Sequence, residues 1–445
     1  MTSLEDIKKY YKSIFLLDDE DDCILDAMAA IAISVHTDSD PIWLMVLGAP
    51  SSGKSELVTS LNDVYKSFPV STITENTFLS GMRSSDGKEL SLLRQIGKQG
   101  LLIMKDYTTI LSMHRDKRDT IIAQFREIYD GEFTKRTGNG VGGQWKGKVN
   151  LIAGVTDALF TSEGEAAEMG RRALNYILPE MSDNVRKDMS RRSVKNINNI
   201  GEMRQKIRTM FKDFVAEKIA ELPAEGLPPV EEEFSESIID LSNFLTKART
   251  ATKRDFQGKL IQVMWHEAPM RANNQLHMMA QMFQWFNEGN ATDKHKRCVY
   301  KIALDSIPKL RRMTLEVLTK FDAVTTKGFA QHLGYPSKTA REWLEDMNVL
   351  GICERSANSL GFGIGVNIDV WTIKEPYREI MLKYSPHIKR VNDTLKGDET
   401  SDSDDDSGGK YNGDPGMAVE EEANAEKDFE ELTGLLDKKD PDLGF

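Results

Sequence analysis

The sequence predicts an α/β fold, in which a parallel sheet is covered by helices, followed by a helical segment and a smaller C-terminal domain. An apolar run at 42–47 leads through a glycine-containing loop into a helical run at 56–66. Two more apolar runs, at 101–104 and 149–155, follow stretches of helical periodicity and end in polar residues. Apolar strands that alternate with helices are typical of parallel sheets.

The composition limits the functions to consider. The chain has 445 residues, enough for several domains with cores of their own. Its net charge is −12, but residues 391–445 hold 18 acidic and 5 basic side chains, so residues 1–390 carry about +1. The acidity is therefore a property of the tail, and the rest of the chain can present basic surfaces to nucleic acid.

The cysteines and the N-terminal sequence indicate in which cellular compartment the protein works. Cys23, Cys298 and Cys353 are far apart and lack the spacing of a zinc site, which favours a reducing environment. The N-terminus is polar and acidic, unlike a secretory signal, and no apolar run approaches the roughly 20 residues that cross a membrane. We expect a cytoplasmic protein that does not interact with membranes.

Residues 1–38 have helical periodicity and are expected to form a helical N-terminal segment, ahead of a core at 39–180. In the core, the strand at 42–47 runs into the pattern G-x-x-x-x-G-K-[ST]. In this pattern the backbone N–H groups and a lysine face phosphate oxygens, and a hydroxyl binds Mg²⁺. The sequence therefore predicts a nucleoside triphosphate site. Its residues are Gly48, Ala49, Pro50, Ser51, Ser52, Gly53, Lys54, Ser55 and Glu56.

The apolar strand at 101–104 leads to Asp106, the position from which such proteins hold Mg²⁺ together with the loop hydroxyl, here Ser55. Many ATPases of this kind have a glutamate directly after that aspartate, whereas this chain has Tyr107. The residue that activates water is therefore open between Glu75 and Glu127. Each of the two is equally explained as a solvated surface charge.

Residues 133–148 predict a β-hairpin with cations on both arms and a glycine-rich tip. Lys135, Arg136, Lys146 and Lys148 are candidates for contacting the phosphates of nucleic acid. An ordinary solvated hairpin is the alternative, because runs of charge usually lie on the wet surface.

The strand at 149–155 ends at Thr156, where a hydroxyl can sense the γ-phosphate or position the attacking water. Arg171 and Arg172 precede an apolar strand at 174–178. From there an arginine can reach the γ-phosphate of a neighbouring copy and stabilise transition-state charge. The alternative is that the pair only neutralises a helix end.

Residues 181–296 are expected to be helical throughout and to form a lid. Within this segment Arg271 lies at the start of a helix that follows a proline. We expect Arg271 to reach back to the nucleotide.

Residues 297–390 predict a winged-helix domain, with a helix at 300–320 and a recognition helix at 337–347. Lys338 and Arg341 on the latter are candidate DNA contacts, with a purely protein-binding role as the alternative.

Residues 391–445 are acidic and poor in apolar side chains, which predicts disorder. The acidic tail ends in Phe445 and is similar to the partner-docking tips of single-stranded-DNA-binding proteins. A tail that only solvates the chain is the alternative.

Taken in order, these features resemble the AAA+ ATPases of the pre-sensor-1 hairpin branch, over about 40–373. Minichromosome-maintenance-type helicases and the replication ATPases of phages and prophages are the most similar. The resemblance implies an AAA+ P-loop NTPase core that binds ATP and Mg²⁺, and a hexameric ring with the hairpin in its channel. It also implies that Thr156 is the first sensor, Arg172 or Arg171 a finger in trans, and Arg271 the second sensor.

The function expected from these features is an ATP-dependent DNA motor, a phage-type replicative helicase or translocase acting on single-stranded or forked DNA in a bacterial host cell. The alternative is an ATP-dependent helicase loader or replication initiator. Such a protein would bind DNA, and a replication partner through the acidic tail, without processive unwinding.

Overall fold

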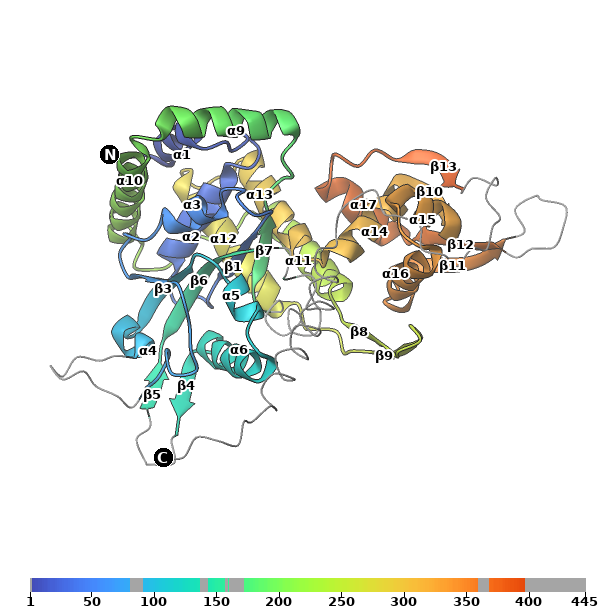
Figure 1. The fold of residues 1–445 in the computed structure, drawn as a ribbon, viewed down its shortest axis with the longest axis horizontal. Coiled ribbons are helices and arrows are strands. Elements are labelled where there is room, and N and C mark those ends of the chain that lie inside the picture. The colour runs from blue at the N-terminus through green and yellow to red at the C-terminus, as the bar shows by residue number, and fades with distance from the viewer. Residues whose placement is uncertain are drawn as a thin grey trace, which may run out of the picture. The chain divides into compact units, whose positions relative to one another are not determined.

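The computed structural model describes residues 2–80, 91–136, 143–156, 159, 172–358 and 368–396. It is an α/β fold with a mostly parallel central sheet, which confirms the predicted class (Figure 1). The strands of this sheet lie in the order β2-β3-β6-β1-β7, and each pair between neighbours is parallel. They are β1 (Trp43–Leu47), β2 (Ser67–Val70), β3 (Gln99–Met104), β6 (Lys148–Val155) and β7 (Leu174–Ile177).

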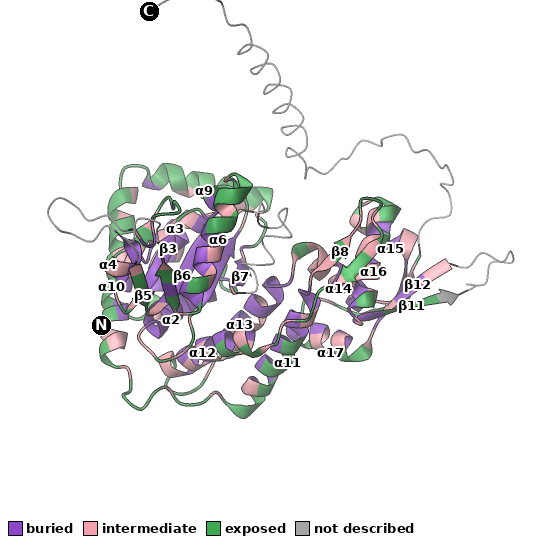
Figure 2. Ribbon diagram, turned by 90° about the horizontal axis from the view of Figure 1, so that it is seen from below, coloured by how far each residue is buried: buried purple, intermediate pink, exposed green. Residues whose placement is uncertain are grey.

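Side chains of the central strands alternate between two cores, one on each face of the sheet. In β1, Leu44 and Val46 join one core, whereas Trp43, Met45 and Leu47 join the other. Figure 2 shows the strands as buried between the helices. The helices packed on the first face include α1 (Leu4–Ile14), α2 (Cys23–Ser34), α3 (Lys54–Thr59), α10 (Ile200–Ala220), α11 (Glu232–Ala248), α12 (Met270–Phe286) and α13 (Asp293–Asp305). Those on the second face are α4 (Leu92–Ile96), α5 (Thr108–Leu111) and α6 (Arg115–Tyr129).

The N-terminal helices belong to the main core. Every residue of α2 is buried, and α2 packs against α10, α12 and β6. Helix α1 begins at a capping box, in which the Ser3 hydroxyl accepts from Asp6 N and the Asp6 carboxylate accepts from Ser3 N. The first helices are therefore an integral layer over the sheet.

The segment 181–296 is largely helical, through α9 (Asp183–Asn196) and α10 to α12, but the expectation of helix throughout is wrong. An antiparallel pair, β8 (Thr252–Arg254) and β9 (Leu260–Val263), interrupts it. The turn between them forms because Gly258 takes a φ of +81° and the Asp255 carboxylate accepts hydrogen bonds from the backbone N–H of Gln257 and Lys259.

In the C-terminal part, a four-stranded sheet of order β11-β12-β10-β13 packs with helices. The predicted helix at 300–320 is wrong, because Pro308, with ψ 135°, separates α13 from the next helix. The predicted disorder from 391 is wrong at its start, because 391–395 pairs with β10. The elements are α14 (Lys309–Lys320), β10 (Phe321–Thr325), α15 (Thr326–Leu333), α16 (Ser337–Val349), β11 (Cys353–Asn358), β12 (Ile368–Ile373), α17 (Glu375–Tyr384) and β13 (Val391–Leu395). The glycine-rich wing at 359–367 and the tail from 397 lie outside the described residues.

Candidate functional site

The loop at 48–55 leaves β1 at the carboxyl edge of the sheet, between β6 and β7. A Cβ on Gly48 would lie 2.7 Å from Ser52 Oγ and 3.3 Å from Leu178 Cβ, so only glycine fits there without a shift. Gly53 takes a φ of +89° directly before α3, a conformation that side chains rarely adopt. The backbone conformation therefore favours glycine at position 53, and the packing of Ser52 and Leu178 favours it at position 48.

Lys54 and Ser52 give this loop its chemistry. Lys54 is only 9% exposed, and its ammonium donates to Gly48 O at 2.5 Å and Ala49 O at 2.6 Å. Ser52 Oγ is buried and has no hydrogen-bond partner among the described residues. A buried cation and an orphaned hydroxyl around one turn of backbone fit an oxyanion such as a phosphate.

Two further predicted residues lie at the same edge of the sheet. Leu47 pairs with Val155 in register, so Thr156 lies beside the start of the loop. Thr156 Oγ1 is 3.3 Å from Thr108 Oγ1, and the exposed Asp106 accepts from Thr108 N at 2.9 Å. The structure thus brings the loop, Asp106 and Thr156 together at the ends of β1, β3 and β6.

At Gly154 the backbone of β6 lies close to the chain that leads from β3 to Asp106. A Cβ on it would lie 2.7 Å from Lys105 O and 3.7 Å from Lys54 Cβ. Lys54 therefore lies close to the chain that carries Asp106. Carboxylate and hydroxyl oxygens are ligands that Mg²⁺ prefers, so Asp106 and Ser55 suit a shared ion. No group of three or more acidic, histidine or cysteine side chains in the part of the chain that the structure describes forms a separate metal site.

The position after Asp106 belongs to the core. Tyr107 is fully buried, packs against Phe125 at 6.1 Å, and burial raises the pKa of its phenol. The candidate bases Glu75 and Glu127 are both exposed. Among the described contacts, no hydrogen bond or ion pair joins either carboxylate to the 48–55 loop; Glu75 contributes only its carbonyl oxygen, to Gln124 and Lys135. The water-activating residue stays open.

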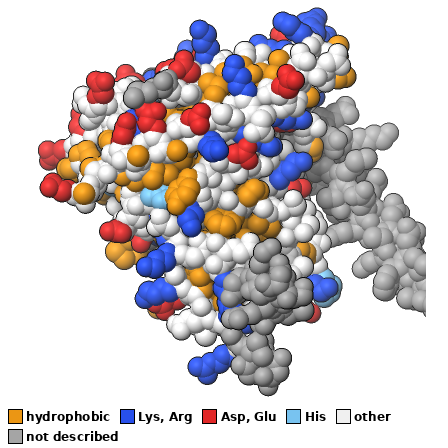
Figure 3. Space-filling model, turned by 90° about the vertical axis from the view of Figure 1, so that its left-hand side faces the viewer, with side chains coloured by type: hydrophobic (Ala, Val, Ile, Leu, Met, Phe, Trp, Pro, Cys, Tyr) orange, Lys and Arg blue, Asp and Glu red, His pale blue; other side chains and the backbone are white. Residues whose placement is uncertain are grey.

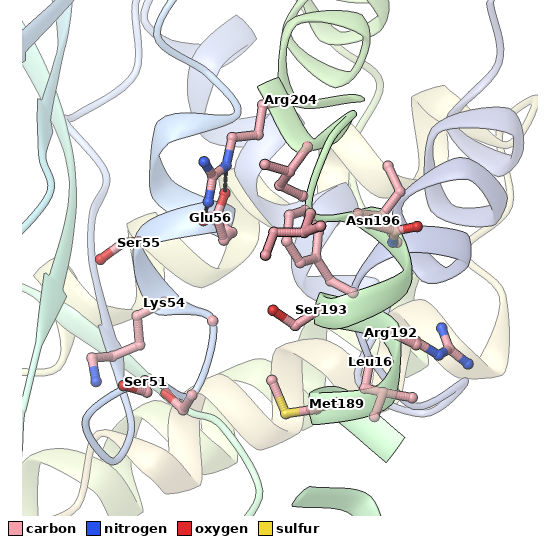
Figure 4. Close-up of a pocket in the computed structure, with 16 residues that line it drawn as sticks. Leu16, Ser51, Lys54, Ser55, Glu56, Met189, Arg192, Ser193, Asn196 and Arg204 are labelled. Carbon is pink, nitrogen blue, oxygen red and sulfur yellow. Dashed lines mark hydrogen bonds and ion pairs between the residues drawn. The ribbon is translucent and has the colours of Figure 1, made fainter. Parts of the chain in front are cut away.

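A pocket of about 410 Å³ opens beside the loop (Figure 4). Residues 51–56 form one wall, residues 14–16 another, and α9 and α10 cover it. Met189 and Ser193 of α9 face the loop across the pocket, whereas the guanidinium of Arg192 turns away and donates to Lys12 O. The pocket has the mixed apolar and polar walls of a small-molecule site.

Arg204 of α10 is a residue of this pocket that the sequence did not single out. Its Nε donates to the Glu56 carboxylate at 2.9 Å, its Nη2 makes a second bond, and this pairing raises the pKa of the guanidinium. Glu56 directly follows Ser55, so the ion pair ties α10 to the loop helix. In the sequence, Arg204 looks like any solvated cation of an amphipathic helix.

The predicted arginines meet at the opposite, amino edge of the sheet. Arg172 lies 6.0 Å and Arg271 5.3 Å from the centre of the Tyr129 ring. Gln275 holds this cluster against the first residue of β1: its side chain accepts from Trp43 N and donates to the Tyr129 hydroxyl and to Arg172 O.

Each arginine of the cluster has an acidic neighbour in its own chain. Arg172 donates to Asp130 at 3.1 Å, and Arg271 donates to Glu267 at 3.4 Å. Because the cluster lies at the start of β1, Arg271 does not lie beside the 48–55 loop of its own chain. Arg171 lies outside the described residues.

The hairpin predicted at 133–148 is present as β4 (Glu132–Lys135) and β5 (Gly143–Lys146), which pair antiparallel. Phe133 and Trp145 anchor it in the core, and Trp145 Nε1 donates to Gly97 O at 2.6 Å. In Figure 3, lysine and arginine side chains lie at the upper end of the face shown and also at its lower end, where Figure 1 places the hairpin. The tip at 137–142 lies outside the described residues.

The four predicted hairpin cations differ in their surroundings. Arg136 is exposed, Lys146 pairs across the strands with Glu132 at 2.7 Å, and Lys135 donates to Glu75 O and Asn76 Oδ1. Lys148 instead begins β6. Its Nζ donates to backbone oxygens at the end of α2, and burial lowers its pKa to about 7. The expectation that Lys148 contacts nucleic acid is therefore wrong.

The predicted recognition helix corresponds to α16. Lys338 is exposed, and Arg341 pairs with Glu345 at 3.1 Å and with Asp369 at 3.4 Å. The β8–β9 hairpin packs on this helix, because Arg254 donates to Asp346 at 2.7 Å and to Glu342 O at 2.6 Å. Part of the surface expected to meet DNA is thus covered by another element.

Within the described residues, no helix is both long and apolar enough to cross a membrane. No protein-family model matches this chain, and no curated protein has a significantly similar sequence.

Proposed function

We propose that this chain is an ATP-dependent DNA motor, of the type of phage replicative helicases and translocases, built on an AAA+ P-loop core with a helical lid and a winged-helix domain. The observation that carries the proposal is the convergence of the 48–55 loop, Asp106 and Thr156 at one edge of the sheet. Lys54 and the loop N–H groups would bind the phosphates, and Ser55 and Asp106 would hold Mg²⁺. The bound ion would neutralise charge on the β- and γ-phosphates.

The position of the arginine cluster supports an assembly of copies. Strand β1 has five residues, so its two ends are about 13 Å apart, and Arg172 lies beyond the far end from the loop. An arginine there has no route to the nucleotide of its own chain. In a head-to-tail ring, such as a hexamer, the amino edge of one copy meets the carboxyl edge of the next. Arg172, with Arg271 beside it, would then contact the neighbour's γ-phosphate.

The basic hairpin supplies the contact with DNA in this proposal. Arg136, directly after β4, and Lys146 of β5 are exposed, and two buried aromatic residues anchor the strand pair. Cations on a rigid support suit the backbone of single-stranded DNA. Movement of the hairpin with the nucleotide state would couple hydrolysis to translocation.

Steady-state ATP hydrolysis, with and without single-stranded DNA, tests the proposal. We expect DNA to stimulate turnover, Lys54→Ala to abolish it, and Lys135→Ala/Arg136→Ala to remove the stimulation while sparing basal hydrolysis. The exposed pair Arg115→Ala/Lys117→Ala, equal in charge lost, is the matched control. Full stimulation in the hairpin variant would refute the motor.

The buried Tyr107 favours a second candidate, an ATP-dependent helicase loader or replication initiator. Without an acid after Asp106, hydrolysis would be slow and nucleotide binding alone would switch the protein. In this case, deleting residues 398–445 abolishes the binding of a replication partner. In a motor, the same deletion leaves strand displacement unchanged.

A further inference from the structure

The most exposed aromatic side chains of the described residues lie in the turn of the β8–β9 hairpin and just after β9. Phe256 is 95% exposed and Trp265 is 91% exposed, and Ile261 between them is 60% exposed. Burying aromatic side chains of this size is strongly favourable, so two rings left almost entirely in water indicate a surface that binds something. We call Phe256, Ile261 and Trp265 the aromatic face.

The support beneath the aromatic face is rigid. Arg254 of β8 is bonded to Asp346 and Glu342 O of α16 and to Gly258 O of the turn. Thr252 Oγ1 donates to Asp346 at 2.9 Å. The hairpin is thus fixed to α16 by polar contacts, while Phe256 and Trp265 stay in solvent.

Lysines surround the aromatic face. Lys253 on β8, Lys259 at the turn and Lys338 on α16 are exposed, and in the described structure none of them pairs with a carboxylate. A groove of about 610 Å³ lies between the turn and α16, lined by Lys259, Lys338 and Arg341 and also by Glu342 and Glu345. The two acids belong to α16, as do Lys338 and Arg341. Glu342 lies against the Gly258 turn, and Glu345 is paired with Arg341.

We propose that the aromatic face binds single-stranded nucleic acid, whose bases stack on Phe256 and Trp265 while Lys253, Lys259 and Lys338 contact its phosphates. Aromatic rings interleaved with cations are the mark of such sites. Protein interfaces are depleted in lysine, which argues against a second copy as the occupant. Duplex DNA suits α16 poorly, because the Gly258 turn packs on Glu342 and Lys338. This site is separate from the β4–β5 hairpin and needs no ATP hydrolysis.

Photocrosslinking tests the stacking directly. The full chain, without nucleotide, is irradiated with an oligothymidylate of roughly 20 residues that carries 5-iodouracil, a length that spans one or more single-strand sites. Iodouracil couples to a ring stacked on it, and mass spectrometry of the peptides then locates the linkage. We expect linkage at Phe256 or Trp265. Linkage confined to other residues, or none at all, overturns the site.

Equilibrium binding of the same oligonucleotide distinguishes stacking from apolar contact. Phe256→Leu/Trp265→Leu keeps the apolar surface but removes the rings, and we expect it to weaken binding about tenfold or more. Phe256→Tyr/Trp265→Phe should bind as the native chain does. Tyr65→Leu, at an exposed ring remote from the hairpin (56% exposed), is the control.

Unchanged affinity in the leucine variant refutes the proposal. If that variant instead assembles less well in sedimentation, the aromatic face joins copies of the chain. Loss of ATP turnover alone would count against the proposed motor and leave this site intact.

Discussion

Lys54 and Arg172 lie at opposite ends of β1, so mixing two inactive variants is the most informative test of a site shared between copies. Lys54→Ala removes the loop cation but leaves Arg172, and Arg172→Ala does the reverse. Arg172 lies beside Tyr129 at the start of β1, whereas Lys54 lies past its end. If each site joins Lys54 of one copy with Arg172 of the next, the two defects lie in different halves of the site.

The size of the effect follows from charge and geometry. An arginine on the transferring phosphate is worth about 10³- to 10⁵-fold in turnover, so Arg172→Ala alone should be nearly inactive. In an equal mixture that exchanges freely, roughly a quarter of head-to-tail interfaces combine an intact Lys54 with an intact Arg172. The mixture should therefore recover up to roughly a quarter of native turnover per site.

The assay is steady-state ATP hydrolysis after the two variants have been mixed and allowed to exchange. Lys54→Ala mixed with the double variant Lys54→Ala/Arg172→Ala is the control, since no interface in it has an intact loop. No recovery above the sum of the separate variants would refute the site shared between copies. Full activity of Arg172→Ala alone would show that this arginine has no part in hydrolysis.

Three further predictions concern the Arg204–Glu56 pair, Tyr107 and Lys148. Arg204→Glu should weaken ATP binding several-fold, because two acids then face each other beside the loop helix; adding Glu56→Arg should restore it, as measured by titration calorimetry. Tyr107→Phe removes a buried hydroxyl with no described partner, so the free energy of unfolding should stay the same or rise by about 1 kcal/mol, and a clear loss in denaturant titration would contradict this. In the folded protein, burial lowers the pKa of Lys148 to about 7. In the unfolded chain, the same ammonium keeps its proton up to about pH 10.4. Stability should therefore rise with pH from about 7 to 10, by up to about 1.4 kcal/mol per unit, and this slope should vanish in Lys148→Met.

The sequence predicted the central strands and the basic hairpin well, because their signals are local. The run at 42–47, the loop after it and the strand at 149–155 all appear where the apolar pattern and the glycines indicate. The β8–β9 pair was missed because its strands are three and four residues long and lie among helical runs. The break at Pro308 was missed although proline ends helices.

The site was predicted in part for the same reason. Thr156 directly follows β6, Asp106 comes two residues after β3, and Lys54 lies at the end of the loop after β1, so the parallel sheet brings them to one edge. The position of Arg271 at the start of β1 could not be predicted, because a helix start says nothing about which end of a sheet the helix approaches. Arg204 and the aromatic face depend on tertiary contacts of surface elements, which periodicity does not encode.

Direct binding of a nucleoside triphosphate tests the central claim of the motor most simply. Titration calorimetry with Mg²⁺ and a slowly hydrolysed ATP analogue should give saturable binding, at one site per chain, for the native protein and for Lys212→Ala, an exposed lysine of α10. Lys54→Ala should lose that binding. Equal affinity in Lys54→Ala, or no binding to the native chain, would contradict a phosphate site at the 48–55 loop.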